Sequence, residues 1–512
     1  MSELRSILSD IASAIRDKNG ASERYHPSEF ASEILNIPTG GGGSASYIEM
    51  YKYQSSTLES YSGDEHYILK HAFEDCENLS EVSFPECIYI GENVFGNCYS
   101  LATASFPECT YIGRNAFCYC NMLSTISFPI CTYVGYGAFD GCYSLTSAIF
   151  PECTYIGDWG FEDCYELSEI SFPKCSYIGS IAFSECKFES AILPECTYIG
   201  SSAFYECYSL ANVSIPKCAY IGESAFAYCN LLGAISAPSC SYIGSYAFYE
   251  CYELSEISFP NCEYIDDGAF EDCYYLTIAS FPECTHIGYS AFSYCNELET
   301  AIFPKISSVE DYLFADEYGA LTTAYFQSCS YIGAYAFSYC ASLSDISFPN
   351  CVYISTHAFG DCGSLSVASF PRCTYIDEEA FTYCNSLESA YFPMCSSISA
   401  NAFSWCYLLS DISFPECKYI ESYAFVGCDS LSTASFPKCS YIGNYAFSGC
   451  TSLSSLYLLG SSCAEICDLD VFENTPFDGG TGIIYVPSSL YNDYITSNYW
   501  SDIADCISAY TE

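Results

Sequence analysis

Apolar and polar positions repeat every 22 residues from about Leu69 to Leu453. One copy reads Leu79-x-x-Val82-x-Phe84-Pro85-x-Cys87-x-Tyr89-Ile90-Gly91-x-x-Val94-Phe95-x-x-Cys98. Its last Phe is an anchor that recurs eighteen times, at Phe73, Phe95, Phe117, Phe139, Phe161, Phe183, Phe204, Phe226, Phe248, Phe270, Phe292, Phe314, Phe337, Phe359, Phe381, Phe403, Phe425 and Phe447. A fixed period in the twenties is typical of coils that bury their apolar side only by stacking on one another. The pattern therefore predicts a repeat solenoid.

Each repeat contains three predicted elements. The segment Leu-x-x-Ile-x-Phe-Pro is a short strand that Pro ends, and Cys-x-Tyr-Ile-Gly is a second extended piece that Gly ends. The segment x-x-Ala-Phe-x-x-Cys is expected to form one helical turn, because Phe and Cys three residues apart then face the same side. The fold class predicted is an α/β repeat solenoid of about eighteen 22-residue units with terminal caps.

The chain outside the repeats divides into smaller segments. Residues 1–37 carry apolar residues at helical spacing, such as Ile7, Ile11 and Ile15, and predict a small helical attachment module. Residues 38–45 are a Gly-rich linker, and residues 46–68 are an N-terminal cap ahead of the solenoid at 69–455. Residues 456–512 should form a C-terminal cap, with a strand at 483–487 and a helix that contains Tyr494 and Trp500.

The repeat departs from its period at two places. It is one residue short between Cys186 and Pro194 and one residue long between Phe314 and Cys329, where Gln327 replaces Pro. The second departure is interpreted as a bend or a boundary between two stacks of coils, with an irregularity shaped for a ligand as the alternative.

The charge of the chain excludes several classes of partner. Lys and Arg total 14 against 63 Asp and Glu, which gives a formal net charge of −49. Nucleic acid and anionic membrane surfaces are therefore disfavoured. The acidity fits a solvated, self-repelling surface, and a cationic ligand or Ca²⁺ sites are the alternatives. Neither a secretory signal nor a run of apolar residues long enough for membrane insertion is visible.

Most of the 37 cysteines follow the repeat, and these predict buried thiols. They occur every eleven residues in two classes, one three residues after the Phe anchor and one after Phe-Pro. A position that recurs in every coil is typical of a core residue, and free Cys behaves as a small buried hydrophobe. Systematic disulfides and metal ligation are the alternatives. Equivalent cysteines on neighbouring strands point the same way, and Cys-x-x-Cys pairs are essentially missing.

Candidate catalytic or cofactor chemistry is not found in the sequence. The five histidines, His26, His66, His71, His286 and His357, occupy unrelated positions of the repeat. No Gly-x-Ser-x-Gly nucleophile motif is present, and the linker is the longest Gly-rich stretch. Paired carboxylates such as Glu162 and Asp163 recur before Cys and suit solvated turns better than catalysis. We expect no enzyme activity, no cofactor and no metal.

The candidate binding surface is a column of tyrosines that precede the Ile of each coil. They are Tyr89, Tyr111, Tyr133, Tyr155, Tyr177, Tyr198, Tyr220, Tyr242, Tyr264, Tyr331, Tyr353, Tyr375, Tyr419 and Tyr441. Because Cys and Ile on either side should point inward, Tyr should point outward and stack into a strip. The strip either stabilises the sheet by cross-strand pairing or recognises a partner with rigid amphipathic rings. It is interrupted at His286, Ser308 and Ser397.

A second, less regular set of tyrosines follows the Cys three residues after the anchor. It comprises Tyr99, Tyr143, Tyr165, Tyr208, Tyr252 and Tyr274, and other coils carry Asn, Thr or Ala at the same position. Such variation on a fixed scaffold is equally consistent with a binding face and with a neutral surface.

The repeat closely resembles the BspA-like, or Treponema-type, leucine-rich repeat family, most clearly over residues 254–276. This chain has Pro-x-Cys where the family usually carries one more residue. The resemblance implies a right-handed coil of the leucine-rich-repeat type and an association with adhesion at bacterial surfaces. The segment IASAIRDKNGASERYHPSEFASEILNIPTGGG resembles short helical segments of phage and prophage tail-associated proteins of Firmicutes.

Together these features favour a non-enzymatic binding or adhesion protein. The repeat rod would present a Tyr-rich acidic surface to a protein or glycan receptor, with residues 1–37 docking it to a virion or another extracellular surface. A phage or prophage tail is the expected setting. The alternatives are a structural rod that assembles with copies of itself as a homo-oligomer, and a bacterial cell-surface adhesin.

Overall fold

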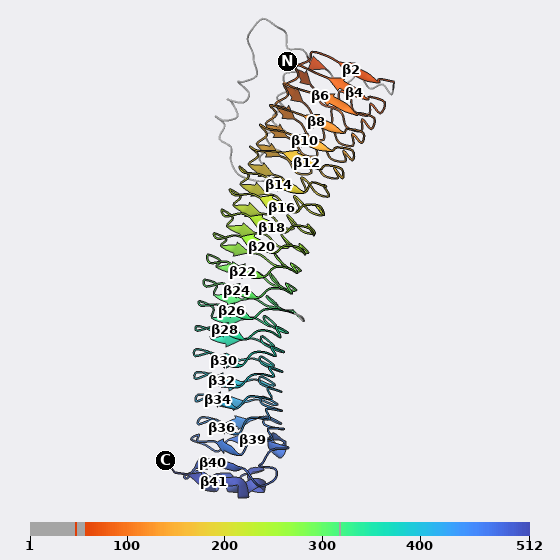
Figure 1. Cartoon of the computed structure of the whole chain (residues 1–512). Helices are drawn as coiled ribbons and strands as arrows, with labels where there is room; N and C mark the ends of the chain where they lie inside the picture. The colour runs from red at the N-terminus through yellow and green to blue at the C-terminus, as the bar shows by residue number, and fades with distance from the viewer. Residues whose placement is uncertain (1–46, 49–56, 317–318, 512) are drawn as a thin grey trace, which may run out of the picture. The chain divides into compact units, whose positions relative to one another are not determined.

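A computed structural model describes the backbone of residues 47–48 and the whole of residues 57–316 and 319–511. The predicted attachment module at 1–37 and linker at 38–45 lie outside the described residues, as does much of the expected cap at 46–68. Contacts within the chain group it into two compact units, one up to Phe259 and one from Pro260 onward. Each unit is a parallel β-solenoid, and the predicted fold class is confirmed (Figure 1).

The first unit contains two kinds of short parallel strand. The two-residue strands pair in chain order and are β1 (Tyr47–Ile48), β3 (Tyr67–Ile68), β5 (Tyr89–Ile90), β7 (Tyr111–Ile112), β9 (Tyr133–Val134), β11 (Tyr155–Ile156), β13 (Tyr177–Ile178), β15 (Tyr198–Ile199), β17 (Tyr220–Ile221) and β19 (Tyr242–Ile243). The three-residue strands are β2 (Ser60–Ser62), β4 (Glu81–Ser83), β6 (Thr103–Ser105), β8 (Thr125–Ser127), β10 (Ser147–Ile149) and β12 (Glu169–Ser171) in one sheet, and β14 (Ser190–Ile192), β16 (Asn212–Ser214), β18 (Ala234–Ser236) and β20 (Glu256–Ser258) in another.

The second unit repeats this arrangement with more interruptions. Its two-residue strands are β21 (Tyr264–Ile265) and β23 (His286–Ile287), which pair, and then β25 (Ser308–Val309), β27 (Tyr331–Ile332), β29 (Tyr353–Ile354), β31 (Tyr375–Ile376), β33 (Ser397–Ile398), β35 (Tyr419–Ile420), β37 (Tyr441–Ile442) and β39 (Glu465–Ile466). Its longer strands are β22 (Ile278–Ser280), β24 (Thr300–Ile302), β26 (Thr323–Tyr325), β28 (Asp345–Ser347), β30 (Val367–Ser369), β32 (Ser389–Tyr391), β34 (Asp411–Ser413), β36 (Thr433–Ser435), β38 (Ser455–Tyr457), β40 (Ile483–Pro487) and β41 (Ile507–Tyr510).

The last coils of the second unit differ from the repeats. A 3₁₀ helix, η1 (Leu469–Phe472), is followed by β40, the helix α3 (Tyr491–Thr496), the 3₁₀ helix η2 (Trp500–Cys506) and β41. Trp500 donates from Nε1 to the carbonyl oxygen of Ala464 at 2.8 Å, and Ala464 N donates to the Tyr494 hydroxyl at 3.0 Å. These buried bonds hold the helical segment against the final coils of the solenoid.

The register of the strands places equivalent residues of successive coils over one another. Ile156 pairs with Ile178, for example, and Tyr155 with Tyr177. In most coils a Gly follows this Ile and allows the close approach, since a Cβ on Gly135 would lie 2.7 Å from the carbonyl carbon of Gly113. Stacking with identical positions in line is therefore a direct consequence of the 22-residue period.

The core contains two columns of phenylalanine rings. Within a column the rings lie nearly parallel, as Phe117 and Phe139 do at 5.2 Å between centroids. Between the columns they meet edge to face, as Phe128 and Phe139 do at 6.1 Å. All three rings are fully buried. Both arrangements are favoured by aromatic rings and stabilise the core beyond simple area burial.

The cysteines line the same core, and their predicted burial is confirmed at the repeat positions. A Cys that follows the Phe anchor donates its S–H to the carbonyl of the Phe in the preceding coil, as Cys142 does to Phe117 at 3.2 Å. A Cys after Phe-Pro donates to the carbonyl two residues later, as Cys109 does to Tyr111 at 3.2 Å. Cys463 and Cys467, which are partly or fully exposed, lie beyond the last repeat.

The helical turn expected at each anchor is wrong. The segment around Phe95 is a series of turns in which Asn93 and Asn97 have φ of 51° and 60°. Residues with left-handed φ end a right-handed helix, so the chain turns the corner of the coil without one. The backbone groups bond to the next coil instead, since Phe95 N donates to Ala116 O at 2.7 Å.

The one-residue insertion does not interrupt the ladders of the solenoid, and the bend expected there stays a prediction. β24 pairs with β26 and β25 with β27, so both ladders continue past the insertion. The stack of Phe rings continues as well, because Phe314 lies 5.3 Å from Phe337. The insertion therefore leaves undisturbed the strands on either side of it that carry the register.

Candidate functional site

The Tyr column of the first unit is a continuous stack of rings. From Tyr89 to Tyr242 neighbouring rings lie 4.7–4.9 Å apart and within 7° of parallel. This distance equals the spacing of hydrogen-bonded strands, so the strands set the stack. Ring faces therefore cover one another. Tyr133 and Tyr155 are only 4% and 9% exposed, and the other members are half-buried.

The Tyr column of the second unit is interrupted and more open. Tyr331, Tyr375 and Tyr419 are 37%, 36% and 48% exposed. Each of them borders a serine, because β25 pairs with β27, and β33 pairs with both β31 and β35. A serine in the column leaves one face of the adjacent ring without a stacking partner in the column. The gaps at Ser308 and Ser397 thus produce accessible tyrosine faces.

The hydroxyls of Tyr177 and Tyr353 remain protonated near neutral pH. Burial raises the pKa of Tyr177 to about 12, and the neighbouring Tyr198 adds to the shift. In the second unit the Tyr353 hydroxyl donates to the Asp377 carboxylate at 2.9 Å, and burial and this carboxylate raise its pKa. The column can offer neutral O–H groups and ring edges to a partner.

The predicted site residues are divided between the two units. Tyr89, Tyr111, Tyr133, Tyr155, Tyr177, Tyr198, Tyr220 and Tyr242 lie on strands of the first unit, and Tyr264, Tyr331, Tyr353, Tyr375, Tyr419 and Tyr441 lie on strands of the second. In the second unit His286 takes a column position and stacks on Tyr264 at 4.0 Å. The second set of tyrosines, after Cys, is exposed by 38–50%.

One set of exposed aromatic residues was missed by the sequence reasoning. Tyr119, Tyr294, Tyr339, Tyr383 and Trp405 stand two residues after the Phe anchor, have positive φ and are 38–50% exposed. A glycine in the next coil makes room for some of these rings, since a Cβ on Gly427 would lie 2.5 Å from the Trp405 ring. The sequence does contain a signal for this set, since each ring stands two residues after the Phe anchor. We did not recognise it because this segment was expected to form a helical turn.

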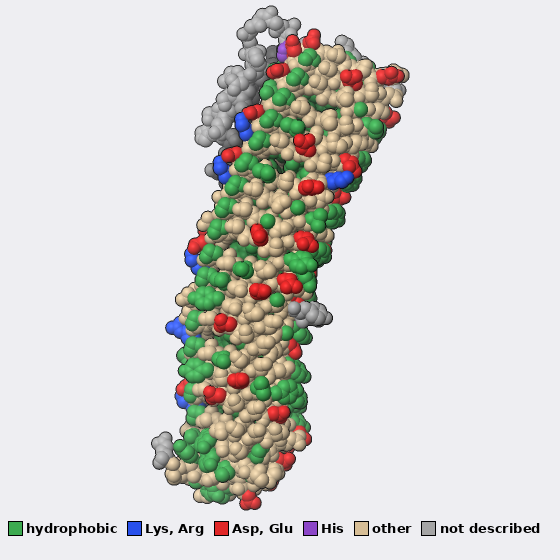
Figure 2. Space-filling view, viewed as in Figure 1, with side chains coloured by type: hydrophobic (Ala, Val, Ile, Leu, Met, Phe, Trp, Pro, Cys, Tyr) green, Lys and Arg blue, Asp and Glu red, His purple; other side chains and the backbone are tan. Residues whose placement is uncertain are grey.

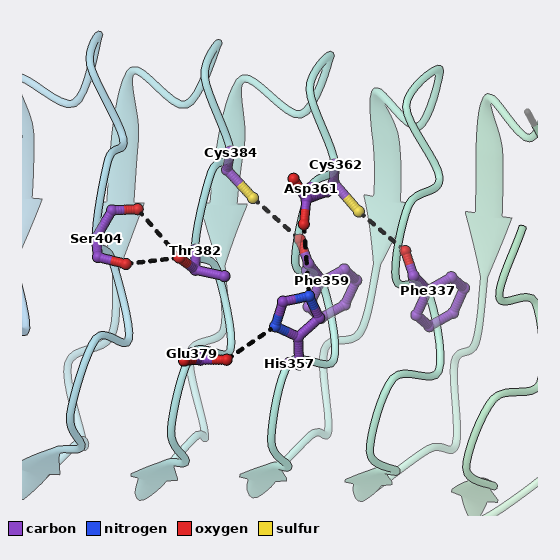
Figure 3. Close-up of polar contacts among 9 residues, drawn as sticks. All are labelled: Phe337, His357, Phe359, Asp361, Cys362, Glu379, Thr382, Cys384 and Ser404. Carbon is purple, nitrogen blue, oxygen red and sulfur yellow. Dashed lines mark hydrogen bonds and ion pairs between the residues drawn. The ribbon is translucent and has the colours of Figure 1, made fainter. Parts of the chain in front are cut away.

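His357 forms the most chemically suggestive cluster of polar side chains (Figure 3). The imidazole is 8% exposed and lies between two carboxylates, with Nδ1 3.3 Å from Glu379 Oε2 and Nε2 3.5 Å from Asp361 Oδ2. These contacts fall outside hydrogen-bond geometry. Burial raises the pKa of Asp361, an effect that His357 opposes.

The thiols near His357 are not activated as nucleophiles. The nearby thiols of Cys362 and Cys384 donate to the carbonyls of Phe337 and Phe359 at 3.1 Å, and burial raises their pKa values well above the ordinary thiol value (Figure 3). A protonated, hydrogen-bonded thiol is a poor nucleophile. Among the side chains drawn in Figure 3, the imidazole acts as a link between two coils.

Carboxylates crowd one corner of the first unit. Burial and the neighbouring Asp163 raise the pKa of Asp140 to about 6, and burial and the nearby Asp140 and Asp163 raise that of Glu162 to about 7. Successive turns are held in line there, since Gly141 N donates to Glu162 O at 3.0 Å. Within residues 57–316 and 319–511, no three His, Cys, Asp or Glu side chains gather as a metal site requires.

Some basic side chains are paired with acidic ones at the surface. Lys174 lies 2.5 Å from Glu152, and Lys217 lies 2.6 Å from Glu195, in each case across one coil. These exposed pairs contribute little to stability. No helix in the described part of the chain has the length and apolar character needed to cross a membrane.

Comparisons with known proteins agree with this geometry. The model of the BspA type leucine rich repeat region matches in six copies, at residues 46–165, 132–235, 197–320, 264–388, 308–416 and 374–478. No curated protein matches the chain.

Solved structures of repeat proteins are similar to this chain. A leucine-rich repeat protein from Bacteroides ovatus ATCC 8483 shares 24% identity over 67% of this chain and 87% of its own, with a TM-score of 0.43. A leucine rich cell surface protein from Faecalibacterium prausnitzii A2-165 shares 22% identity over 57% of this chain and 83% of its own, with a TM-score of 0.30. A leucine-rich repeat protein from Eubacterium ventriosum ATCC 27560 shares 19% identity over 65% of this chain and 84% of its own, with a TM-score of 0.26.

Proposed function

We propose that this chain, which belongs to the BspA-type leucine-rich repeat family, is a non-enzymatic binding protein that recognises a protein or glycan receptor at an extracellular surface. The observation that carries the proposal is the accessibility of the Tyr column beside its serine gaps. Tyr331, Tyr375 and Tyr419 are more than a third exposed on strands that fix their positions. Rigid, amphipathic rings of this kind give large contact area at a low entropic cost.

The proposal assigns different roles to the two stretches of the column. In the first unit Tyr89, Tyr111, Tyr133, Tyr155, Tyr177, Tyr198, Tyr220 and Tyr242 contribute mainly ring edges and hydroxyls, because stacking covers their faces. In the second unit the rings beside Ser308 and Ser397 contribute faces as well. A net charge of −49 keeps nucleic acid away and favours a neutral or cationic receptor surface.

The test compares a triple variant with a matched control. Tyr331→Ser, Tyr375→Ser and Tyr419→Ser together should lower binding to bacterial-surface glycans and extracellular proteins on a printed array at least ten-fold. The control, Tyr274→Ser with Tyr407→Ser, removes rings that are 39% and 40% exposed in the same unit but lie off the strands, and it should keep wild-type binding. Equal binding by the triple variant and the wild type would remove the proposal.

The setting we propose is a phage or prophage tail, with residues 1–37 as the attachment module. Its support is the resemblance of that segment to tail-associated proteins. Removal of residues 1–45 should abolish co-sedimentation with phage tails while array binding persists. Co-sedimentation that survives the deletion would favour the bacterial adhesin, and concentration-dependent growth of the purified chain in light scattering would favour the self-assembling rod.

A further inference from the structure

We propose that two grooves over the three-residue strands of the first unit bind an extended, neutral oligosaccharide through rows of free hydroxyls. The proposal rests on the binding function proposed above and names a ligand class and a place for it. The place is separate from the Tyr column, which lies on the two-residue strands.

The first groove crosses β4, β6, β8 and β10 and has a volume of about 400 Å³. In each strand the central residue faces inward and its two neighbours face outward, as in β8, where Ile126 is 3% exposed. The outward side chains form two parallel rows across the strands. Thr103, Thr125 and Ser147 belong to one row, and Ser83, Ser105 and Ser127 belong to the other.

The second groove repeats the arrangement over β14, β16, β18 and β20, with a volume of about 420 Å³. Its rows include Ser190 and Asn212 on one side and Ser214, Ser236 and Ser258 on the other. The one-residue deletion separates the two grooves, because β12 ends one sheet and β14 begins the next. Phe188 fills the core at the deletion and is 1% exposed.

The hydroxyls along the first groove make no hydrogen bond within the described residues, unlike those in the columns beside it. Thr146 Oγ1, one residue before β10, donates to Ser124 O at 3.0 Å, and Ser168 Oγ, one residue before β12, donates to Thr146 O at 3.4 Å. No such bond involves Thr103, Thr125 or the serines that face them. The fold thus satisfies the neighbouring hydroxyls internally and leaves these rows for a ligand or water.

The spacing of the rows selects among extended ligands. Neighbouring strands are about 4.8 Å apart, and residues i and i+2 of a strand are about 6.7 Å apart. An α-helix, about 10 Å wide, cannot enter between the rows. An extended peptide advances about 3.3 Å per residue and loses register with the strands. A polysaccharide advances by about one strand spacing per sugar ring, and it presents hydroxyls on both sides.

The charge of the grooves points to a neutral ligand. Each groove has one carboxylate in its lining, Glu81 in the first and Glu256 in the second, although the whole chain carries a net charge of −49. Figure 2 has the view of Figure 1, and its surface over the strands that are labelled in Figure 1 is mostly tan with isolated red carboxylates. Hydroxyls that both donate and accept complement the hydroxyls of a neutral sugar.

The second unit provides an internal control. Its corresponding positions include Tyr325, Tyr391 and Asp345. A strand of the same sequence as β6, Thr-Ala-Ser, recurs there as β36, where Thr433 and Ser435 are exposed beside Tyr457 of β38. The same side chains therefore occur along the first groove and, in the second unit, on a strand whose neighbour carries a Tyr.

The experiment is affinity electrophoresis of the full chain in gels that contain β-glucan, mannan, galactan or dextran. At least one of these neutral polysaccharides should retard the wild type. The groove variant, Thr103→Val, Ser105→Ala, Thr125→Val and Ser127→Ala, should raise the dissociation constant at least ten-fold. The control variant, Thr433→Val with Ser435→Ala, should migrate like the wild type. Unchanged thermal unfolding of both variants verifies that they fold.

Three results would overturn the inference: no retardation of the wild type by any neutral polysaccharide, equal retardation of the groove variant, or retardation by heparin or chitosan alone. None of them removes the proposed function. If the wild type still binds array ligands and Tyr331→Ser, Tyr375→Ser and Tyr419→Ser abolish that binding, the chain is a binding protein whose ligand does not occupy the grooves.

Discussion

The Tyr columns of the two units occupy the same position of the coil but differ in continuity. From Tyr89 to Tyr242 each ring of the first unit stacks on its neighbours at 4.7–4.9 Å. In the second unit Tyr331 and Tyr353 are 5.4 Å apart and tilted by 16°, and serine replaces Tyr at two positions. An uninterrupted column covers its own faces, whereas a gap exposes the rings beside it.

This difference shows that a repeat position has no fixed role. Tyr155 is 9% exposed, yet Tyr419 is 48% exposed, although both stand directly before the Ile of a two-residue strand. What differs is the residue at the same position in the neighbouring coils. A Tyr between two other Tyr residues therefore contributes mainly to stability, whereas a Tyr next to a Ser has an exposed ring that can contact a partner.

Removal of a ring from the continuous column should have the largest effect on stability. Tyr133→Ser should destabilise the first unit by roughly 1–3 kcal/mol, because it deletes a buried ring and two stacking contacts. Tyr419→Ser in the second unit should cost less than about 0.5 kcal/mol, since nearly half of that ring is already exposed. Hydrogen exchange resolved by peptide measures each unit separately. Equal costs at the two positions would contradict the distinction between the columns.

Filling a gap should have a smaller, opposite effect. Ser397→Tyr places a ring between Tyr375 and Tyr419 on paired strands and should stabilise the second unit by about 0.5–1 kcal/mol. The matched variant Ser308→Tyr has one Tyr neighbour in its sheet, Tyr331, and should gain about half as much. Urea unfolding measures both. Ser397→Tyr should also weaken receptor binding, and unchanged binding would show that the covered faces are not used.

The repeating part of the fold was predictable because nearly every coil carries the same types of apolar residue at the same offsets. Phe, Ile and Cys at fixed offsets specified which side chains face inward, and the structure buries Phe117, Ile112 and Cys120 accordingly. The helical turn was mispredicted because Phe and Cys three residues apart satisfy both a helix and a chain of turns. Asn115 and Tyr119 have positive φ, which is compatible with the chain of turns and not with the helix. The spacing of apolar residues in the sequence does not reveal the φ of a residue.

The sequence predicted where the tyrosines of the candidate site lie on the strands, but it did not predict how exposed their rings are. The position of Tyr before Ile follows from alternation along a strand. Its exposure depends on how far apart the rings lie and on what fills the corner beside them, which are properties of packing between coils. The hydroxyl rows of the grooves were missed for a related reason. Thr103 and Thr110 look alike in sequence, and only the structure shows that Thr110 is bonded to the preceding coil.

The smallest predicted difference between the two units is in how their stability depends on pH. In the first unit this dependence comes from the carboxylates of Asp140 and Glu162. The pKa of Asp140 is raised to about 6 and that of Glu162 to about 7, against about 4 in an unfolded chain. The folded state therefore binds more protons between these values, and its stability falls as pH rises through 6 to 7. Because both groups are partly exposed, the loss from pH 5 to pH 8 should be about 1 kcal/mol or less.

Two variants isolate this contribution. Asp140→Asn with Glu162→Gln should flatten the dependence on pH in the first unit, measured as the urea midpoint or as regional hydrogen exchange at pH 5 and pH 8. Glu169→Gln, which changes an exposed carboxylate on β12, should leave it unchanged. In the second unit burial raises the pKa of Asp361, so a pH dependence there should respond to Asp361→Asn and not to the first-unit variants. If the first-unit variants altered both units equally, the pH effect would belong to the net charge of the chain and not to the stacked corner.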